Sequence, residues 1–161
     1  MKKLVGTLLA LVMVLCLMTA VAEPLNLTMY FPVNVGGSAA ALIDAMTQDF
    51  NTEHPDIRVE AVYTGNYDDT VTAIQSAIQG GNAPDLFVSL ATQRFTMADT
   101  KMAMPLDDLI AADPEGQAFV DDFIDGFMLD SYVDGSIYSI PFQRSTMVMF
   151  YNKDAFREVG L

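Results

Sequence analysis

Pairs of adjacent carboxylates are the side chains in this sequence whose types best suit acid–base chemistry. They occur at three places: Asp68-Asp69, Asp107-Asp108 and Asp121-Asp122. A glycoside hydrolase needs two carboxylates that face each other across a sugar. Adjacent residues point to different faces of a helix or strand, so these pairs are poor partners for each other. We interpret them as surface charges and helix-start acids, and a secreted carbohydrate hydrolase with acids from 107–134 is the alternative.

Other catalytic groups are scarce. The single histidine, His54, precedes Pro55 at an expected helix end, where an exposed structural role is favoured. The single cysteine, Cys16, lies in an apolar run near the start, and no cysteine follows it. Gly80-Gly81 closes an expected helix instead of opening one, so no phosphate-binding glycine loop is predicted. The sequence therefore favours a binding protein, not an enzyme, with no metal or cofactor.

Residues 1–22 have the pattern of a secretory signal peptide. Two lysines follow Met1, the run Leu4–Met18 carries no charge, and Ala20-Val21-Ala22 offers small residues at a cleavage site. The run is too short for a stable membrane span. Lipid attachment at Cys16 is disfavoured because the bulky Leu15 precedes it. The protein is therefore predicted to be exported, into a periplasm or to the cell surface and beyond.

The chain is strongly acidic. Without Lys2 and Lys3 the formal net charge falls from −13 to −15, and 107–134 holds nine carboxylates with no lysine or arginine. Such a charge repels nucleic acids and anionic lipid surfaces, so neither is expected as a partner. The acidic stretch lacks the Asp-x-Asp-x-Asp-Gly pattern of a calcium loop and is interpreted as a solvated face.

The first half of the mature sequence alternates expected strands and helices. Strands are predicted at Leu25–Phe31, Ile57–Tyr63 and Asp85–Leu90, the last one buried on both faces. A helix over 39–52, capped at Ser38, carries Leu42, Met46 and Phe50 on one face, with Asn51 elsewhere. A second helix, with Val71, Ile74 and Ile78 on one face, ends at Gly80-Gly81. This order predicts an open, mostly parallel α/β sheet with ligands at the carboxyl ends of its strands, near 32–38, 64–67 and 91–96.

After Pro105 the pattern changes. Short helices are expected at 106–110 and 119–128, and a hairpin at Asp134-Gly135. Residues 145–151 read as a further apolar strand, followed by a helix with Asn152 as its N-cap and Gly160 as its stop. We therefore divide the chain into a signal peptide (1–22), a first α/β lobe (23–105) and an acidic segment with a hairpin and a crossover strand (106–161).

Two stretches also carry a family resemblance. They are TGNYDDTVTAIQSAIQGGNAPDLFV at 64–88 and PFQRSTMVMFYNKDAFREVGL at 141–161. With the opening strand and the signal peptide, they resemble the start of the extracellular solute-binding proteins of ABC importers, of the family 1 type for sugars and glycerol 3-phosphate. The resemblance implies a periplasmic-binding-protein-like fold, a sugar or glycerol-phosphate ligand held between two lobes, a membrane permease as partner, and a monomer at full length.

The resemblance also implies which residues contact the ligand. The tyrosine of the Gly-Asn-Tyr motif falls on Tyr67, and a serine before the last strand falls on Ser145. A glutamate that accepts hydrogen bonds from glycerol hydroxyls is replaced by Ala91, which counts against glycerol phosphate. Arg144 stands where an uncharged residue is usual, and its guanidinium suits an anionic ligand.

In this family the chain continues into a second lobe after the region that matches 147–161. The sequence is therefore expected to be a fragment, and a non-functional remnant is a further alternative. A single lobe leaves its hydrogen bonds to the solute in competition with water, so residues 23–161 are expected to bind solute more weakly than about 1 mM. Its sheet also keeps an unpaired edge and uncovered apolar surface, so we expect marginal stability and self-association.

The cleavage motif gives the first testable prediction. We expect export to produce a mature N-terminus at Glu23, because Ala20 and Ala22 occupy the small-residue positions of the motif. N-terminal sequencing of the protein from an expressing cell measures this directly. A lipid-modified start at Cys16 would contradict both the cleavage site and the soluble exported form.

Overall fold

The structure, a computed structural model, describes residues 23–32, 38–145 and 147–161. The chain divides into two compact units. The first ends at Ser89, and the second begins at Leu90. The proposed signal peptide lies outside the described residues. The lobe boundary after residue 105 remains a prediction.

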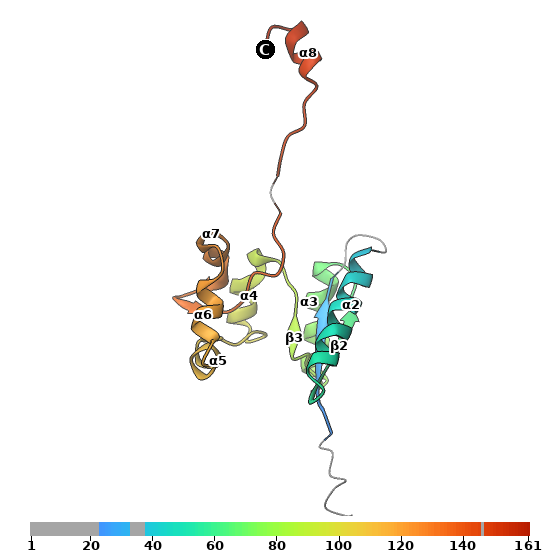
Figure 1. The fold of residues 1–161 in the computed structure, drawn as a ribbon, viewed down its shortest axis with the longest axis vertical. Coiled ribbons are helices and arrows are strands. Elements are labelled where there is room, and N and C mark those ends of the chain that lie inside the picture. The colour runs from blue at the N-terminus through green and yellow to red at the C-terminus, as the bar shows by residue number, and fades with distance from the viewer. Residues whose placement is uncertain (1–22, 33–37, 146) are drawn as a thin grey trace, which may run out of the picture. The chain divides into compact units, whose positions relative to one another are not determined.

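A parallel three-stranded sheet forms the centre of the first unit. Its order is β2-β1-β3, with β1 at Leu25–Phe31, β2 at Ile57–Tyr63 and β3 at Leu86–Phe87 (Figure 1). The register between β1 and β2 runs without interruption over all seven residues of each strand. The α/β class and the parallel sheet are thus confirmed, because each helix between two strands returns the chain to the end of the sheet where the strands begin.

The third strand is shorter and more exposed than the sequence predicts. Only Leu86 and Phe87 pair with β1, and 47% of Leu86 is exposed, so burial on both faces was wrong. Among the described residues β3 is an edge strand, with a neighbour on one side only. The Asp85 carboxylate Oδ2 accepts a hydrogen bond from the Thr28 N–H at 2.8 Å. A side chain thus makes the contact just before the backbone pairing of β1 with β3 begins.

The first helix has the predicted position, but its predicted face is wrong. Helix α2 spans Ser38–Glu53. Leu42 and Met46 are 61% and 50% exposed, whereas Ile43 is only 7% exposed. His54 lies exposed just beyond the helix, as expected, with its ring centroid 4.4 Å from that of Phe50.

Asn51 explains how α2 is turned. Its side-chain Nδ2 donates to the Val59 carbonyl at 2.9 Å, and its Oδ1 accepts from the Val59 N–H at 2.7 Å. Val59 lies in β2, the other edge of the sheet, so the amide takes the hydrogen bonds that a further strand would make. Because Asn51 must face this edge, the row that contains Ile43 is buried and the neighbouring row with Leu42 and Met46 faces outward.

The second helix has the predicted position, but its predicted face is only partly buried, since Ile78 is 42% exposed. Helix α3 spans Tyr67–Gln79, with Thr70 and Ile74 fully buried. Gly80 forms its C-cap, and Gly81 follows at φ +72°, a conformation in which a residue with Cβ is strained. The predicted stop at the two glycines is confirmed.

The second unit consists of short elements. They are η1 (Ala91–Gln93), α4 (Arg94–Asp99), α5 (Asp107–Ala112), α6 (Gly116–Asp121), α7 (Asp125–Met128), η2 (Leu129–Ser131), β4 (Tyr132–Val133), β5 (Ser136–Ile137) and α8 (Lys153–Glu158). Val120, Met128 and Ile137 form its buried cluster. The predicted helix over 119–128 is broken between α6 and α7. The hairpin is confirmed, since Asp134 and Gly135 both have positive φ, as a two-residue turn of this kind requires.

The predicted strand at 145–151 was wrong. Its described residues have no regular secondary structure, and Met147 and Phe150 are 100% and 93% exposed. A strand needs a neighbour for its backbone hydrogen bonds, and in the described part of the chain this segment pairs with none. Helix α8 does follow, with the Asn152 side chain accepting from the Asp154 N–H at 2.9 Å and Gly160 at φ +79° after its end.

The unexpected rotation of α2 gives a second prediction. Ile43→Ala should lower the free energy of unfolding by about 2–5 kcal/mol, because it leaves a cavity against the sheet. The neighbouring Leu42→Ala removes a similar side chain from an exposed position and should change it by only about 0.5 kcal/mol. Urea unfolding followed by circular dichroism measures both. A larger loss for Leu42→Ala would contradict the observed rotation of α2.

Candidate functional site

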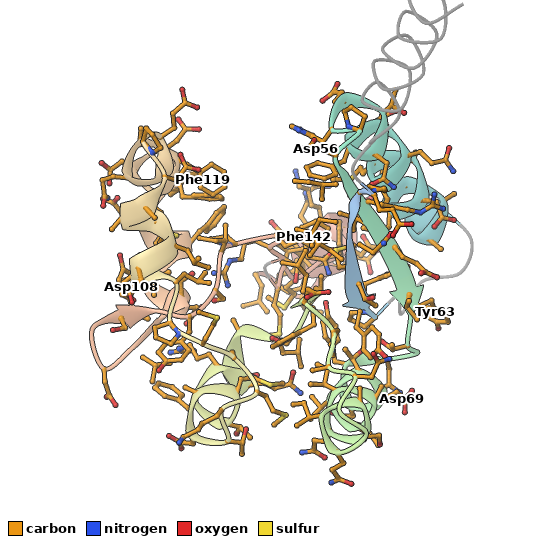
Figure 2. The ribbon with its side chains drawn as sticks, turned by 90° about the horizontal axis from the view of Figure 1, so that it is seen from below. Asp56, Tyr63, Asp69, Asp108, Phe119 and Phe142 are labelled. Atoms are coloured by element: carbon orange, nitrogen blue, oxygen red, sulfur yellow. The ribbon has the colours of Figure 1, made fainter. Side chains whose placement is uncertain are left out.

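The loop between β2 and α3 lies at the carboxyl end of the sheet and is held by several hydrogen bonds. Figure 2 shows Tyr63 at the end of β2 and Asp69 in the first turn of α3. Between them, the Asn66 side chain accepts hydrogen bonds from the N–H groups of Asp68 and Asp69, at 2.8 and 3.0 Å. The Asp69 carboxylate in turn accepts from the Asn66 N–H at 3.1 Å. This reciprocal capping box determines where the helix begins.

Gly65 permits this close turn. Its φ is +100°, and a Cβ at this position would lie 2.5 Å from Asp69 Oδ2. Any other residue would thus strain the backbone and displace the carboxylate that completes the capping box. The glycine and the asparagine of the Gly-Asn-Tyr motif therefore have a structural explanation that requires no ligand.

Two threonines tie the same loop to the sheet. The hydroxyls of Thr64 and Thr70 lie 2.7 Å apart, and the Thr64 N–H donates to the Phe31 carbonyl at 3.1 Å. Thr70 Oγ1 also donates to the Asn66 carbonyl at 2.9 Å. These bonds join the ends of β1 and β2 to the start of α3, so the loop has little freedom to move.

Tyr67 is the first residue of α3 and is partly buried. Its backbone position is set by the capping box immediately before it. A tyrosine offers a ring that can stack on a sugar and a hydroxyl that can donate or accept a hydrogen bond. Its role as a ligand contact remains a prediction.

Arg144 has a well-defined environment in the second unit. Its Nη1 lies 3.4 Å from Asp130 Oδ2, and its Nη2 donates to the Phe127 carbonyl. The guanidinium carbon lies 5.8 Å from the centroid of the Phe127 ring. The Arg144 side chain is 25% exposed. The guanidinium is therefore accessible but already faces a carboxylate.

Ser145 and Ala91 belong to the same unit as Arg144. Ser145 is exposed in a segment without regular structure. Ala91 begins η1, and its carbonyl accepts a hydrogen bond from Arg94 Nη1 at 2.8 Å. Tyr67, in contrast, belongs to the first unit. The ligand roles of Tyr67, Arg144 and Ser145 all remain predictions.

Sequence reasoning did not identify Arg94 and Asp130 as functional candidates. Arg94 Nη1 lies 3.4 Å from Asp130 Oδ1, whereas Arg144 faces the other carboxylate oxygen, Oδ2. The three residues are far apart in the sequence, and no periodic pattern connects them. One feature of the sequence does point to such a contact. Residues 107–134 hold nine carboxylates and no lysine or arginine, so a cationic partner for any of these carboxylates must lie outside this stretch.

A shallow hollow of about 400 Å³ lies in the first unit. Its lining includes Pro24, Gln48, Pro55 and Arg58. Pro24 precedes β1 and Pro55 precedes β2, so the hollow is at the amino ends of these strands. Ligands of open α/β sheets bind at the carboxyl ends, so we do not assign the hollow to solute binding.

Neither a cluster of metal-ligating side chains nor a membrane-spanning helix occurs in the described residues. Within them, no three side chains of the metal-ligating types come together. No helix in the described ranges has both the length and the apolar composition to cross a membrane.

Comparison with known sequences gives consistent matches. Residues 45–159 match the family model for bacterial extracellular solute-binding proteins. The sn-glycerol-3-phosphate-binding periplasmic protein UgpB of Escherichia coli O1:K1 is 34% identical over 164 residues, covering 100% of this chain and 36% of that protein. UgpB of E. coli K12 is 34% identical over 137 residues, covering 83% of this chain and 31% of that protein. The chain thus spans about a third of the length of these relatives.

Solved structures show the same fold. CpMnBP1, solved with mannotriose bound, superposes with a TM-score of 0.63 at 24% identity, covering 85% of this chain and 33% of that one. An ABC substrate-binding protein from Listeria monocytogenes, in complex with cycloalternan, gives a TM-score of 0.55 at 24% identity, covering 72% and 28%. At this identity the matches establish the fold and not the ligand.

The capping box generates a third prediction. Asn66→Ala should lower the free energy of unfolding by about 1 kcal/mol, because the N–H groups of Asp68 and Asp69 lose their acceptor. Hydrogen exchange of those two amides should become faster at the same time. Asn82→Ala, just beyond the other end of α3, is the matched control, since there the described hydrogen bond comes from the Asn82 backbone. Equal effects of the two substitutions would contradict the assigned role of Asn66.

Proposed function

The chain belongs to the family of bacterial extracellular solute-binding proteins, and from this premise we propose that it is the substrate-binding component of an ABC importer. The observation that supports this most is the 34% identity to E. coli UgpB across the whole of this chain. The proposed ligand is a carbohydrate or a glycerol-phosphate-type solute. The protein would bind its solute without transforming it, and its relatives are binding proteins.

The geometry of the first unit supports a binding role. The Thr64–Asn66 loop is rigid, lies at the carboxyl end of β2 and presents Tyr67 at its end. A preformed contact loses little conformational entropy when a ligand arrives. This is what a site for a small polar solute requires, since each of its hydrogen bonds contributes only modestly in water.

Two solute classes remain open, and the residues favour different ones. CpMnBP1 was solved with mannotriose and the Listeria protein with cycloalternan, both of which are carbohydrates. Ala91 cannot supply a side-chain acceptor for glycerol hydroxyls. Arg144 favours an anionic group such as a phosphate. The proposed partners follow from the family: the solute itself and a membrane permease that senses the occupied state, after export of the binding protein.

The competing proposal is a secreted carbohydrate hydrolase. It needs two carboxylates that face each other, and in the described structure Asp107 instead accepts from the Ile137 N–H at 3.2 Å, while Asp121 accepts from Gln117 at 2.8 Å. These acids have structural partners, which favours the binding protein. Turnover of a chromogenic glycoside by the purified chain would favour the hydrolase.

The fourth prediction tests the binding function. Chemical-shift titration of the chain with glycerol 3-phosphate, mannotriose and cycloalternan should show saturable binding of at least one solute without turnover. Tyr67→Ala should weaken that binding by about 1–3 kcal/mol, or about 5- to 150-fold, through the loss of a stacking or hydrogen-bonding contact.

Tyr67→Phe is the matched control, because it retains the ring and removes only the hydroxyl. Retained affinity in this variant would assign the contact to stacking, and lost affinity would assign it to the hydroxyl. Unchanged affinity in Tyr67→Ala would show that Tyr67 is structural. Absence of any concentration-dependent chemical-shift change for every solute in the panel would contradict the proposed function itself, because even weak binding shifts the signals of the contacting residues.

A further inference from the structure

We propose that Arg94 and Arg144 together form an anion-binding site, in which the carboxylate of Asp130 holds the place of a phosphate or carboxylate group of the solute. As a solute site it rests on the proposed function and selects the anionic class of ligand. Arg94 is a site residue that neither the sequence nor the family match indicated.

Two guanidinium groups converge on one carboxylate. Arg94 Nη1 lies 3.4 Å from Asp130 Oδ1, and Arg144 Nη1 lies 3.4 Å from Asp130 Oδ2. Each oxygen thus faces a different arginine. One carboxylate thus faces two positive charges, in a chain whose formal net charge is −13. A single anionic group placed between the arginines would contact both.

The arginines do not depend on Asp130 for their positions. Arg94 donates from Nη1 to the Ala91 carbonyl at 2.8 Å and from Nε to the Tyr132 carbonyl at 3.2 Å. Its guanidinium carbon also lies 4.3 Å from the centroid of the Phe95 ring, within the range of a cation–π contact. Removal of the Asp130 charge therefore leaves Arg94 in place.

Arg144 is held in a similar way. Its Nη2 donates to the Phe127 carbonyl, and its guanidinium lies beside the Phe127 ring. The two arginine side chains are only 18% and 25% exposed. Both cations thus have contacts other than Asp130, which lowers the entropy lost when an anion binds.

Asp130 is a loosely held occupant. Strong ion-pair hydrogen bonds between nitrogen and oxygen measure about 2.7–2.9 Å, and both of its contacts are longer. The Arg157–Asp154 pair in α8 reaches 2.8 Å, so a close pair is possible elsewhere in this unit. The Asp130 side chain is also 49% exposed, more than either arginine side chain. A ligand can therefore displace it toward solvent.

A phosphate group suits the vacated position. It carries three acceptor oxygens and more negative charge than one carboxylate, and a guanidinium can donate to it through two parallel N–H groups. Asp130 would compete with such a group, so its charge lowers the affinity of the site for anions. A neutral sugar gains nothing from displacing it.

The fifth prediction tests the site with inorganic phosphate alone. In the full chain, the Nε–Hε NMR signals of Arg94 and Arg144 should shift together and saturably on titration with phosphate at constant ionic strength. Asp130→Asn should bind phosphate about five- to tenfold more tightly, since one repelling charge about 4 Å away has been removed. Arg144→Gln should abolish the saturable shift of Arg94.

Arg157 and Asp154 provide the matched control. The Arg157 side chain is 77% exposed and pairs with Asp154, so its signal should show no saturable shift, and Asp154→Asn should leave the phosphate affinity unchanged. If Arg94 and Arg144 shift no more than Arg157 in the unmodified chain, the proposal fails, whether or not Asp130→Asn folds. An unchanged phosphate affinity in a folded Asp130→Asn variant also overturns it.

Titrations with solutes distinguish a failure of this anion site from a failure of the proposed function. Glycerol 3-phosphate should shift both arginines, and glycerol should shift neither. Shifts with inorganic phosphate but not with glycerol 3-phosphate would overturn the role in solute binding. Binding of mannotriose together with the absence of any arginine shift on glycerol 3-phosphate would support the proposed function and contradict the anionic class.

Discussion

The pair of hydrogen bonds between the Asn51 side chain and the Val59 backbone is the contact on which the arrangement of the first unit depends. At 2.7 and 2.9 Å they close the outer edge of β2, which has β1 on its other side. They also fix the rotation of α2, because a helix held through Asn51 must bury the row of Ile43. The Asn51 amide therefore determines both how the β2 edge is closed and which face of α2 is buried.

With that edge closed, the strands determine where a solute can bind. β1 pairs with β2 over its full length and with β3 near its end, and all three run in parallel. Their carboxyl ends therefore lie at one side of the sheet, and the chain there turns directly into α3 through Gly65 and Asn66. The capping box makes this turn rigid, so the position of Tyr67 is a consequence of backbone geometry as well as a candidate for function.

Local rules in the sequence predicted the elements that local interactions determine. β1, β2, α3, the Asp134-Gly135 hairpin and the ends of α8 all follow from alternation, caps and turn residues. Partners far away in the sequence could not be predicted in this way. The sequence predicts burial for the apolar row of Leu42, because nothing in it reveals that Asn51 meets Val59. It does not predict the Arg94–Asp130–Arg144 cluster for the same reason. The strand expected at 145–151 has the right composition, but composition does not supply a partner.

The acidity of the chain and the arginine pair act over different distances. A net charge of −13 repels an anion at long range, but at physiological salt this repulsion is screened beyond about 8 Å. At contact distance the two guanidiniums dominate, because they are partly covered and less screened. An anionic solute is therefore favoured only where both arginines reach it at once. Asp130 then determines the strength of that preference, since it is the nearest carboxylate and the one that an anion must replace.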